Sequence, residues 1–109
     1  MNRRDIKQGM TVYHRLFTHF GKGTVVDLVP RTALESMFER YTSHFRVLVE
    51  FEHAEPKPLR CLPNALRKTP NRKKITDMVA MYKLRGVEAI DAGDKLIIPE
   101  RNGHDSKQD

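Results

Sequence analysis

Residues 9–14 read Gly-Met-Thr-Val-Tyr-His and residues 19–26 read His-Phe-Gly-Lys-Gly-Thr-Val-Val, and these two runs decide the fold. β-Branched and aromatic residues fill both runs, which favours strands over 9–14 and 23–29. Glycines at positions 21 and 23 supply the backbone freedom that a strand reversal or a bulge requires. We therefore expect the opening of a small antiparallel β-structure, with residues 15–22 as a connection longer than a two-residue turn.

Further strands follow in the middle of the chain. Residues 45–52 alternate in polarity, and the apolar face consists of Phe45, Val47, Val49 and Phe51. The prolines that follow predict a turn. After it we expect a shorter strand over 59–62, a helical turn over 63–66 and a brief strand at 67–68. Several short strands with close turns predict a five-stranded SH3-like β-barrel over residues 9–68.

A short helix is predicted inside this β-rich part. Thr32 and Glu35 have the spacing of a capping box, in which each side chain satisfies the backbone amide of the other. The helix should cover residues 33–41 and carry one apolar face, formed by Leu34, Met37, Phe38 and Tyr41. We expect that face to pack on the core as a cap of the barrel; the alternative is that it faces a partner.

The last third changes to a helical period. A helix is predicted over about residues 71–85. Thr69 is its expected N-cap, Pro70 is expected at the first helical position, and Gly86 lies where the helix should end. Its apolar stripe comprises Ile75, Met78, Val79 and Tyr82. Strands over 87–90 and 95–98 should then flank a turn at 91–94 and dock, with the helix, on the barrel. The prediction is one α+β domain over residues 1–100 with a disordered tail at 101–109.

Residues 9–68, a little over half of the chain, carry a family resemblance. The residues concerned are Gly9, Val12, His14, Phe20, Gly21, Gly23, Val25, Val49 and Phe51. Their pattern resembles the Tudor-like (SH3-like) C-terminal domain of UvrD/PcrA-type DNA helicases. This chain departs from that pattern by a longer first loop and by the helical insert. No helicase motor is recognised in the sequence, so no ATPase activity is expected. The resemblance implies a module that contacts nucleic acid or a repair or transcription protein such as RNA polymerase.

A second, weaker resemblance concerns the predicted helix and hairpin. Arg85-Gly86-Val87 and Gly93-Asp94-Lys95-Leu96 are similar to a small docking module attached to many bacterial and phage proteins. This resemblance implies a protein partner.

Composition narrows the class of protein. The 109 residues include no tryptophan and one cysteine, Cys61, so no internal disulfide forms and a reducing cytoplasm is expected. Neither an apolar run long enough to cross a membrane nor an export signal is recognised, so we expect no membrane partner.

Positive charge is concentrated in one segment. The chain has a net charge of +6, and residues 55–85 alone hold nine Lys or Arg against two Asp or Glu. Clustered cations attract polyanions. The predicted nucleic-acid-binding residues are Arg15, Lys22, Lys57, Arg60, Arg67, Lys68, Arg72, Lys73 and Lys74.

Aromatic residues offer one candidate for stacking on a base. Phe17 lies in the basic loop after the first strand, where either a stacking role or a core role is open. Phe20 is expected in the core, where the family resemblance implies that it plugs the barrel mouth. Phe45, Phe51 and Tyr82 fit core stripes.

Catalysis is not predicted. The five histidines and Cys61 lack the spacing of a metal site, and Cys61 is best explained as a small core residue. Asp91 and Asp94 are explained by the hairpin turn. We therefore expect no catalytic residue, no metal, no cofactor and no small-molecule substrate.

Two functions remain open from the sequence. The first is a non-enzymatic adaptor that contacts the phosphates of duplex DNA through the basic patch, in DNA repair or transcription. The alternative is a protein–protein interaction module, such as a bacterial or phage accessory protein, that binds a polymerase, helicase or nuclease.

Overall fold

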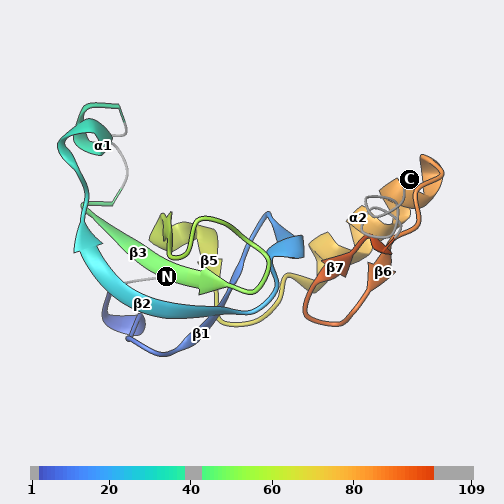
Figure 1. Ribbon diagram of the computed structural model, residues 1–109, viewed down its shortest axis with the longest axis horizontal. Coiled ribbons are helices and arrows are strands. Elements are labelled where there is room, and N and C mark those ends of the chain that lie inside the picture. The colour runs from blue at the N-terminus through green and yellow to red at the C-terminus, as the bar shows by residue number, and fades with distance from the viewer. Residues whose placement is uncertain (1–2, 39–42, 100–109) are drawn as a thin grey trace, which may run out of the picture.

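The structure, a computed structural model, describes residues 3–38 and 43–99. Its main element is a five-stranded antiparallel sheet in the order β4-β3-β2-β1-β5 (Figure 1). The strands are β1 (Thr11–His14), β2 (Gly23–Pro30), β3 (Phe45–Phe51), β4 (Leu59–Cys61) and β5 (Leu66–Arg67). Short 3-10 turns occupy Arg3–Asp5 (η1), Thr18–Phe20 (η2) and Pro63–Ala65 (η3).

The α+β class and the antiparallel strand set are confirmed, whereas closure into a barrel is not. In the described part of the chain, the edge strands β4 and β5 pair only with β3 and β1 respectively. β5 begins one residue earlier than expected, at Leu66, because Tyr13 pairs with Arg67 and His14 with Leu66. The long first connection is confirmed and contains η2.

The core lies on the apolar face of the sheet. Its buried residues are Ile6, Val12, Val25, Val47, Val49, Phe51, Ala54, Cys61 and Leu66. Phe20 and Phe45 are half-buried and pack against this cluster, so the predicted core roles of Phe20, Phe45 and Phe51 are confirmed.

The two glycines of the opening stretch meet different requirements. Gly21 has φ +77°, which other residues rarely adopt. Gly23 is needed for space, because a Cβ atom there would lie 2.7 Å from the Phe51 ring and from Val49. The strand reversal and the core are therefore built around the same short run.

The insert helix α1 (Ala33–Phe38) begins with the predicted capping box. The Thr32 amide donates to Glu35 Oε1 (2.7 Å), and the Glu35 amide donates to Thr32 Oγ1 (3.1 Å). Residues 39–41 of the expected helix, with Tyr41, lie outside the described residues.

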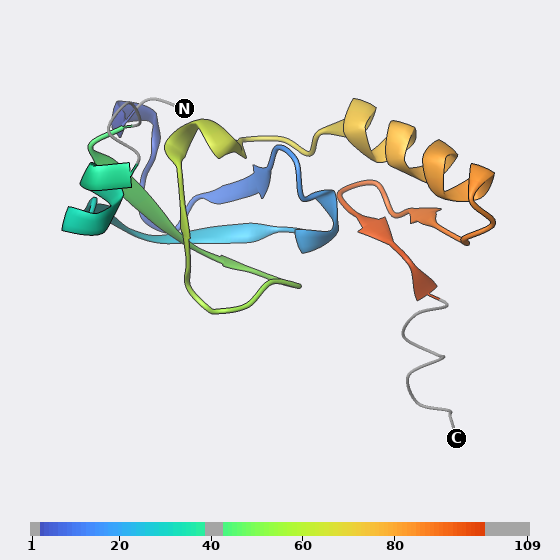
Figure 2. The same cartoon turned by 90° about the horizontal axis from the view of Figure 1, so that it is seen from above.

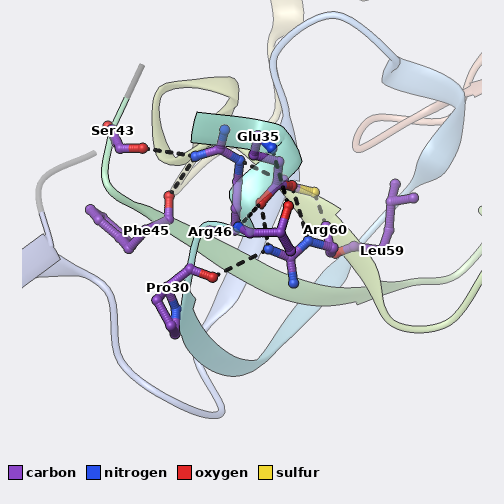
Figure 3. A network of polar contacts seen from close by, with 9 residues as sticks. Pro30, Glu35, Ser43, Phe45, Arg46, Leu59 and Arg60 are labelled. Carbon is purple, nitrogen blue, oxygen red and sulfur yellow. Dashed lines mark hydrogen bonds and ion pairs between the residues drawn. The ribbon is translucent and has the colours of Figure 1, made fainter. Parts of the chain in front are cut away.

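The expected core packing of α1 is wrong. Leu34, Met37 and Phe38 are 65%, 67% and 77% exposed. The helix is held instead through Glu35, whose carboxylate accepts from Arg60 (2.7 and 3.1 Å) and lies 3.5 Å from the buried Arg46 (Figure 3). This polar anchorage leaves the apolar stripe facing solvent.

The long helix α2 (Arg72–Leu84) ends as predicted but begins with a different cap. Asn71, not Thr69, is the N-cap, and its side chain accepts from the Lys74 amide (3.2 Å). At the other end, Gly86 and Val87 donate to the Lys83 and Tyr82 carbonyls, which is the Schellman motif.

The hairpin of β6 (Ile90–Asp91) and β7 (Leu96–Ile97) is shorter than expected. It packs with α2 beside the end of the sheet, next to η2, rather than placing the helix across the core (Figures 1 and 2). Only Ile75 of the α2 stripe is fully buried. The helix and hairpin therefore meet the sheet at one junction. Within the described residues, no helix has the length and apolar character needed to cross a membrane.

Candidate nucleic-acid interface

The junction between the sheet and α2 is organised around Asn71. While its side-chain oxygen caps α2, its Nδ2 donates to the Arg15 carbonyl (2.8 Å), 56 residues away in sequence. The Arg15 guanidinium donates to the Asn64 carbonyl (2.9 Å), and its amide donates to the Ala65 carbonyl (2.8 Å). These bonds bring the loop after β1 to the segment that leads into α2.

Five of the predicted cations lie around this junction. They come from the loop after β1, from the β5–α2 segment and from the first turn of α2, and we call them the junction patch: Arg15, Arg67, Lys68, Lys73 and Lys74. Arg67 and Lys74 are half-buried and the other three are exposed. Of the described residues, none forms a side-chain ion pair with Arg67, Lys68 or Lys74. The positive end of the α2 dipole adds to the same potential.

Carboxylates reduce the charge of this region. Lys73 lies 3.8 Å from Asp77 in an exposed i, i+4 pair, and Asp94 lines a small hollow together with Asn71. The local excess of positive charge is therefore smaller than the sequence count implies, and Arg67, Lys68 and Lys74 are among the cations without an ion-pair partner in the described part of the chain.

Arg72 is engaged by the hairpin. Its guanidinium donates to both oxygens of Asp91 (2.6 and 2.7 Å) and to the Gly93 carbonyl (2.7 Å). The hydrogen bond from Arg72, with a second one from the Gly93 amide, lowers the pKa of Asp91 to about 2. This arginine thus ties α2 to β6.

Lys57 and Arg60 are not brought to the junction patch. Arg60 lies on β4, at the sheet edge opposite β5, and pairs with Glu35. Lys57 donates to the carbonyls of Phe51, Glu52 (3.3 Å) and Ala54 (3.2 Å) in the β3–β4 connection. Both cations hold local structure, and the structure does not bring them into the junction patch.

Lys22 flanks the patch. Val12 pairs with Gly23, so the antiparallel register places Lys22 opposite Tyr13. Tyr13 in turn pairs with Arg67 on β5. Its amide donates to Glu52 Oε1 (3.2 Å), and Glu52 also pairs with Lys95 (3.0 Å). A carboxylate therefore lies beside Lys22.

Phe17 belongs to a cluster of rings at this end of the sheet. Its ring centroid lies 4.7 Å from His14 and 5.2 Å from Phe20, and its side chain is 49% exposed. His14 Nδ1 accepts from the Leu16 and Phe17 amides, both at 3.1 Å. Burial, and then the nearby His19, lower the pKa of His14, which suits an imidazole that accepts hydrogen bonds.

Cys61 is a core residue, as predicted. It is buried on β4, and burial raises the pKa of its thiol to about 11. A thiol of this kind is a poor nucleophile near neutral pH. Among the described residues, no three His, Cys, Asp or Glu side chains are grouped so that they could hold a metal ion.

The chain matches no protein-family model, and no curated protein or solved structure gives a significant match. Fold and site together define an α+β protein in which a five-stranded antiparallel sheet is joined to a helix–hairpin unit through a basic junction. The sequence did not reveal the bonds of Asn71 and Arg46 that shape this arrangement, because both residues act over long sequence distances or through main-chain carbonyls.

Proposed function

We propose that this protein is a non-enzymatic, cytoplasmic adaptor that contacts the phosphates of duplex DNA through the junction patch, in DNA repair or transcription. The observation that carries the proposal is the gathering of Arg15, Arg67 and Lys68 with the first turn of α2. Phosphate oxygens accept hydrogen bonds from such cations and from helix N-termini. Contacts of this kind give affinity and orientation without reading sequence.

We also propose kinship with the Tudor-like (SH3-like) barrel of UvrD/PcrA-type helicases. The strand order β4-β3-β2-β1-β5, with the 3-10 turn η3 immediately before β5, supports it. In this proposal β4 and β5 are the strands that would approach each other to complete the barrel, and RNA polymerase or a repair protein is a partner.

Phe17 has a secondary role in the proposal. It lies two residues from Arg15 and keeps about half of its side chain exposed. An unpaired base at a duplex end or junction would stack on it, with a contribution of roughly 1–3 kcal/mol.

The experiment is fluorescence anisotropy on labelled short duplexes of two unrelated sequences, between about 50 mM and about 200 mM salt. Wild type should bind both duplexes alike, with an affinity that falls as salt rises. The double variant Lys73→Glu/Lys74→Glu should bind both more weakly. Loss of two phosphate contacts should flatten the slope of log K against log salt by about two.

The matched control is Lys83→Glu/Arg85→Glu, which makes the same charge change at the other end of α2, about 15 Å along the helix. This variant should bind nearly as wild type. Equal losses in the two double variants, or no salt-dependent binding by wild type at low ionic strength, would refute the proposal.

A further inference from the structure

A groove runs between the loop after β1 and the helix–hairpin unit. It consists of two adjoining hollows of about 390 and about 530 Å³, which share His19, Tyr82, Leu96 and Ile98 as lining residues. Figures 1 and 2 show η2 beside the hairpin, and both elements supply residues that line the two hollows. The groove follows from the way α2 is placed: it packs on β6 and β7 and leaves the space toward η2 unfilled.

The walls of the groove are mainly apolar. Leu16 and Phe17 contribute from the loop and are 58% and 49% exposed. Met78 and Tyr82 contribute from α2, where they belong to the stripe predicted to be core but remain half-buried. A helix stripe and loop side chains that remain uncovered on facing walls are typical of a surface that binds another chain.

The charged residues that line the groove are all basic. Lys74 lines one hollow and Lys95 the other, and the imidazoles of His19 and His53 are further polar lining residues. Among the described residues, no aspartate or glutamate lines either hollow. Glu52 pairs with Lys95 at 3.0 Å, so Lys74 is the rim cation without a carboxylate partner in the described part of the chain. Such a rim complements an acidic ligand.

We propose that this groove docks an acidic segment of a partner protein, with apolar anchor side chains that fill the two hollows. Apolar walls favour leucine or phenylalanine anchors, and the basic rim favours flanking glutamate or aspartate. This places the interaction-module function on a specific surface. It does not require DNA binding, because the anchors would contact Leu16, Tyr82 and Leu96; Lys74 belongs both to the rim of the groove and to the junction patch.

The probe is a fluorescein-labelled peptide with Leu and Phe at i, i+3, i+4 and i+7 and Glu elsewhere, added to the 109-residue chain. Binding should saturate, and amide chemical shifts should change at Leu96 and Ile98 in spectra of labelled protein. Leu16→Ser should raise the Kd about tenfold, since burial of one leucine side chain is worth at least that factor. A peptide with Lys in place of Glu should bind more weakly than the acidic one.

The matched control is Leu84→Ser, which removes an equally large apolar side chain that is 89% exposed on α2 and lies outside both hollows. It should leave the Kd unchanged, and circular dichroism should show that both serine variants are folded. An unchanged Kd in Leu16→Ser, or shift changes confined to α1, would overturn the proposal. Concentration-dependent self-association that Leu16→Ser abolishes would assign the groove to a second copy and would also overturn it.

DNA affinity gives an independent readout. Leu16→Ser removes no charge, so it should leave duplex binding as in wild type, whatever its effect on the peptide. Failure of peptide binding and failure of DNA binding are therefore separate results.

Discussion

Arg72 and Asp91 form a two-bond ion pair in which Nη1 donates to Oδ1 at 2.6 Å and Nη2 donates to Oδ2 at 2.7 Å. The pair joins the first residue of α2 to the second residue of β6. A cation that sequence alone groups with the phosphate-binding residues thus stabilises the helix–hairpin unit.

This pair predicts an acid-sensitive hairpin. Because the pKa of Asp91 falls from 3.8 to about 2 on folding, its contribution to stability is complete above about pH 4 and is lost as the pH falls from 3.8 toward 2. Denaturant unfolding of wild type between pH 5 and pH 2 should show this loss. Asp91→Asn should remove part of the pH dependence, whereas Asp77→Asn, which breaks only the exposed 3.8 Å pair with Lys73, should retain it.

Glu35 should control the position of α1. Hydrogen bonds from Arg60 and from the Thr32 amide lower the pKa of Glu35 to about 2, so its carboxylate stays ionised across the neutral and mildly acidic range. Glu35→Gln weakens both ion pairs while it keeps the side-chain shape. Hydrogen exchange at the Ser36 amide, which donates to the Thr32 carbonyl, should become several-fold faster. Unchanged exchange would contradict the assignment of Glu35 as the residue that holds the helix.

Asn71 should contribute through two separable bonds. Asn71→Ala removes the cap of α2 and the bond to the Arg15 carbonyl, and should lower the free energy of unfolding by about 0.5–2 kcal/mol or somewhat more. Asn71→Asp keeps an oxygen for the cap but loses the donor to Arg15. Urea unfolding should give Asn71→Asp a stability between those of wild type and Asn71→Ala, which would separate the two bonds. Equal stability of the Asp and Ala variants would argue against the cap.

Gly23→Ala should destabilise the sheet although it adds only a methyl group. The new Cβ atom would lie 2.7 Å from the Phe51 ring, so the core must shift, at a cost of about 1–3 kcal/mol. Thr24→Ala, at the next position on β2 and exposed, is the control and should change the free energy of unfolding by less than about 0.5 kcal/mol. Comparable thermal midpoints for the two variants would contradict the close approach.

His14 should make the loop after β1 sensitive to mild acid. The pKa of His14 is below 6.5 in the folded state, because of burial and of His19, so the folded protein loses stability as the pH falls below 6.5. Protonation of Nδ1 also removes the acceptor of the Leu16 and Phe17 amides. An NMR titration should show a His14 pKa under 6.5, and His14→Ala should cost about 1–3 kcal/mol for two lost hydrogen bonds. A His14 pKa at or above 6.5 would contradict the bonding found here.

Sequence patterns predicted the elements whose signals are local. The alternation of Phe45 to Phe51 defines a strand with one buried face, and the capping box at Thr32 and the terminal glycine at Gly86 mark helix ends. Each signal spans a few residues, so periodicity and capping chemistry suffice to recognise it. The α+β class and the place of Cys61 in the core follow from the same kind of information.

The tertiary structure alone decided which charges remain available and which apolar faces remain uncovered. Arg60 meets Glu35 across 25 residues, and Asn71 meets Arg15 across 56, so no local pattern could reveal these contacts. Through such contacts, cations such as Arg60 form ion pairs within the fold and the apolar residues of α1 remain exposed to solvent. A groove remains open beside α2. The physical reason is that ion pairing and burial depend on distance in space, whereas the sequence orders the same residues along the chain.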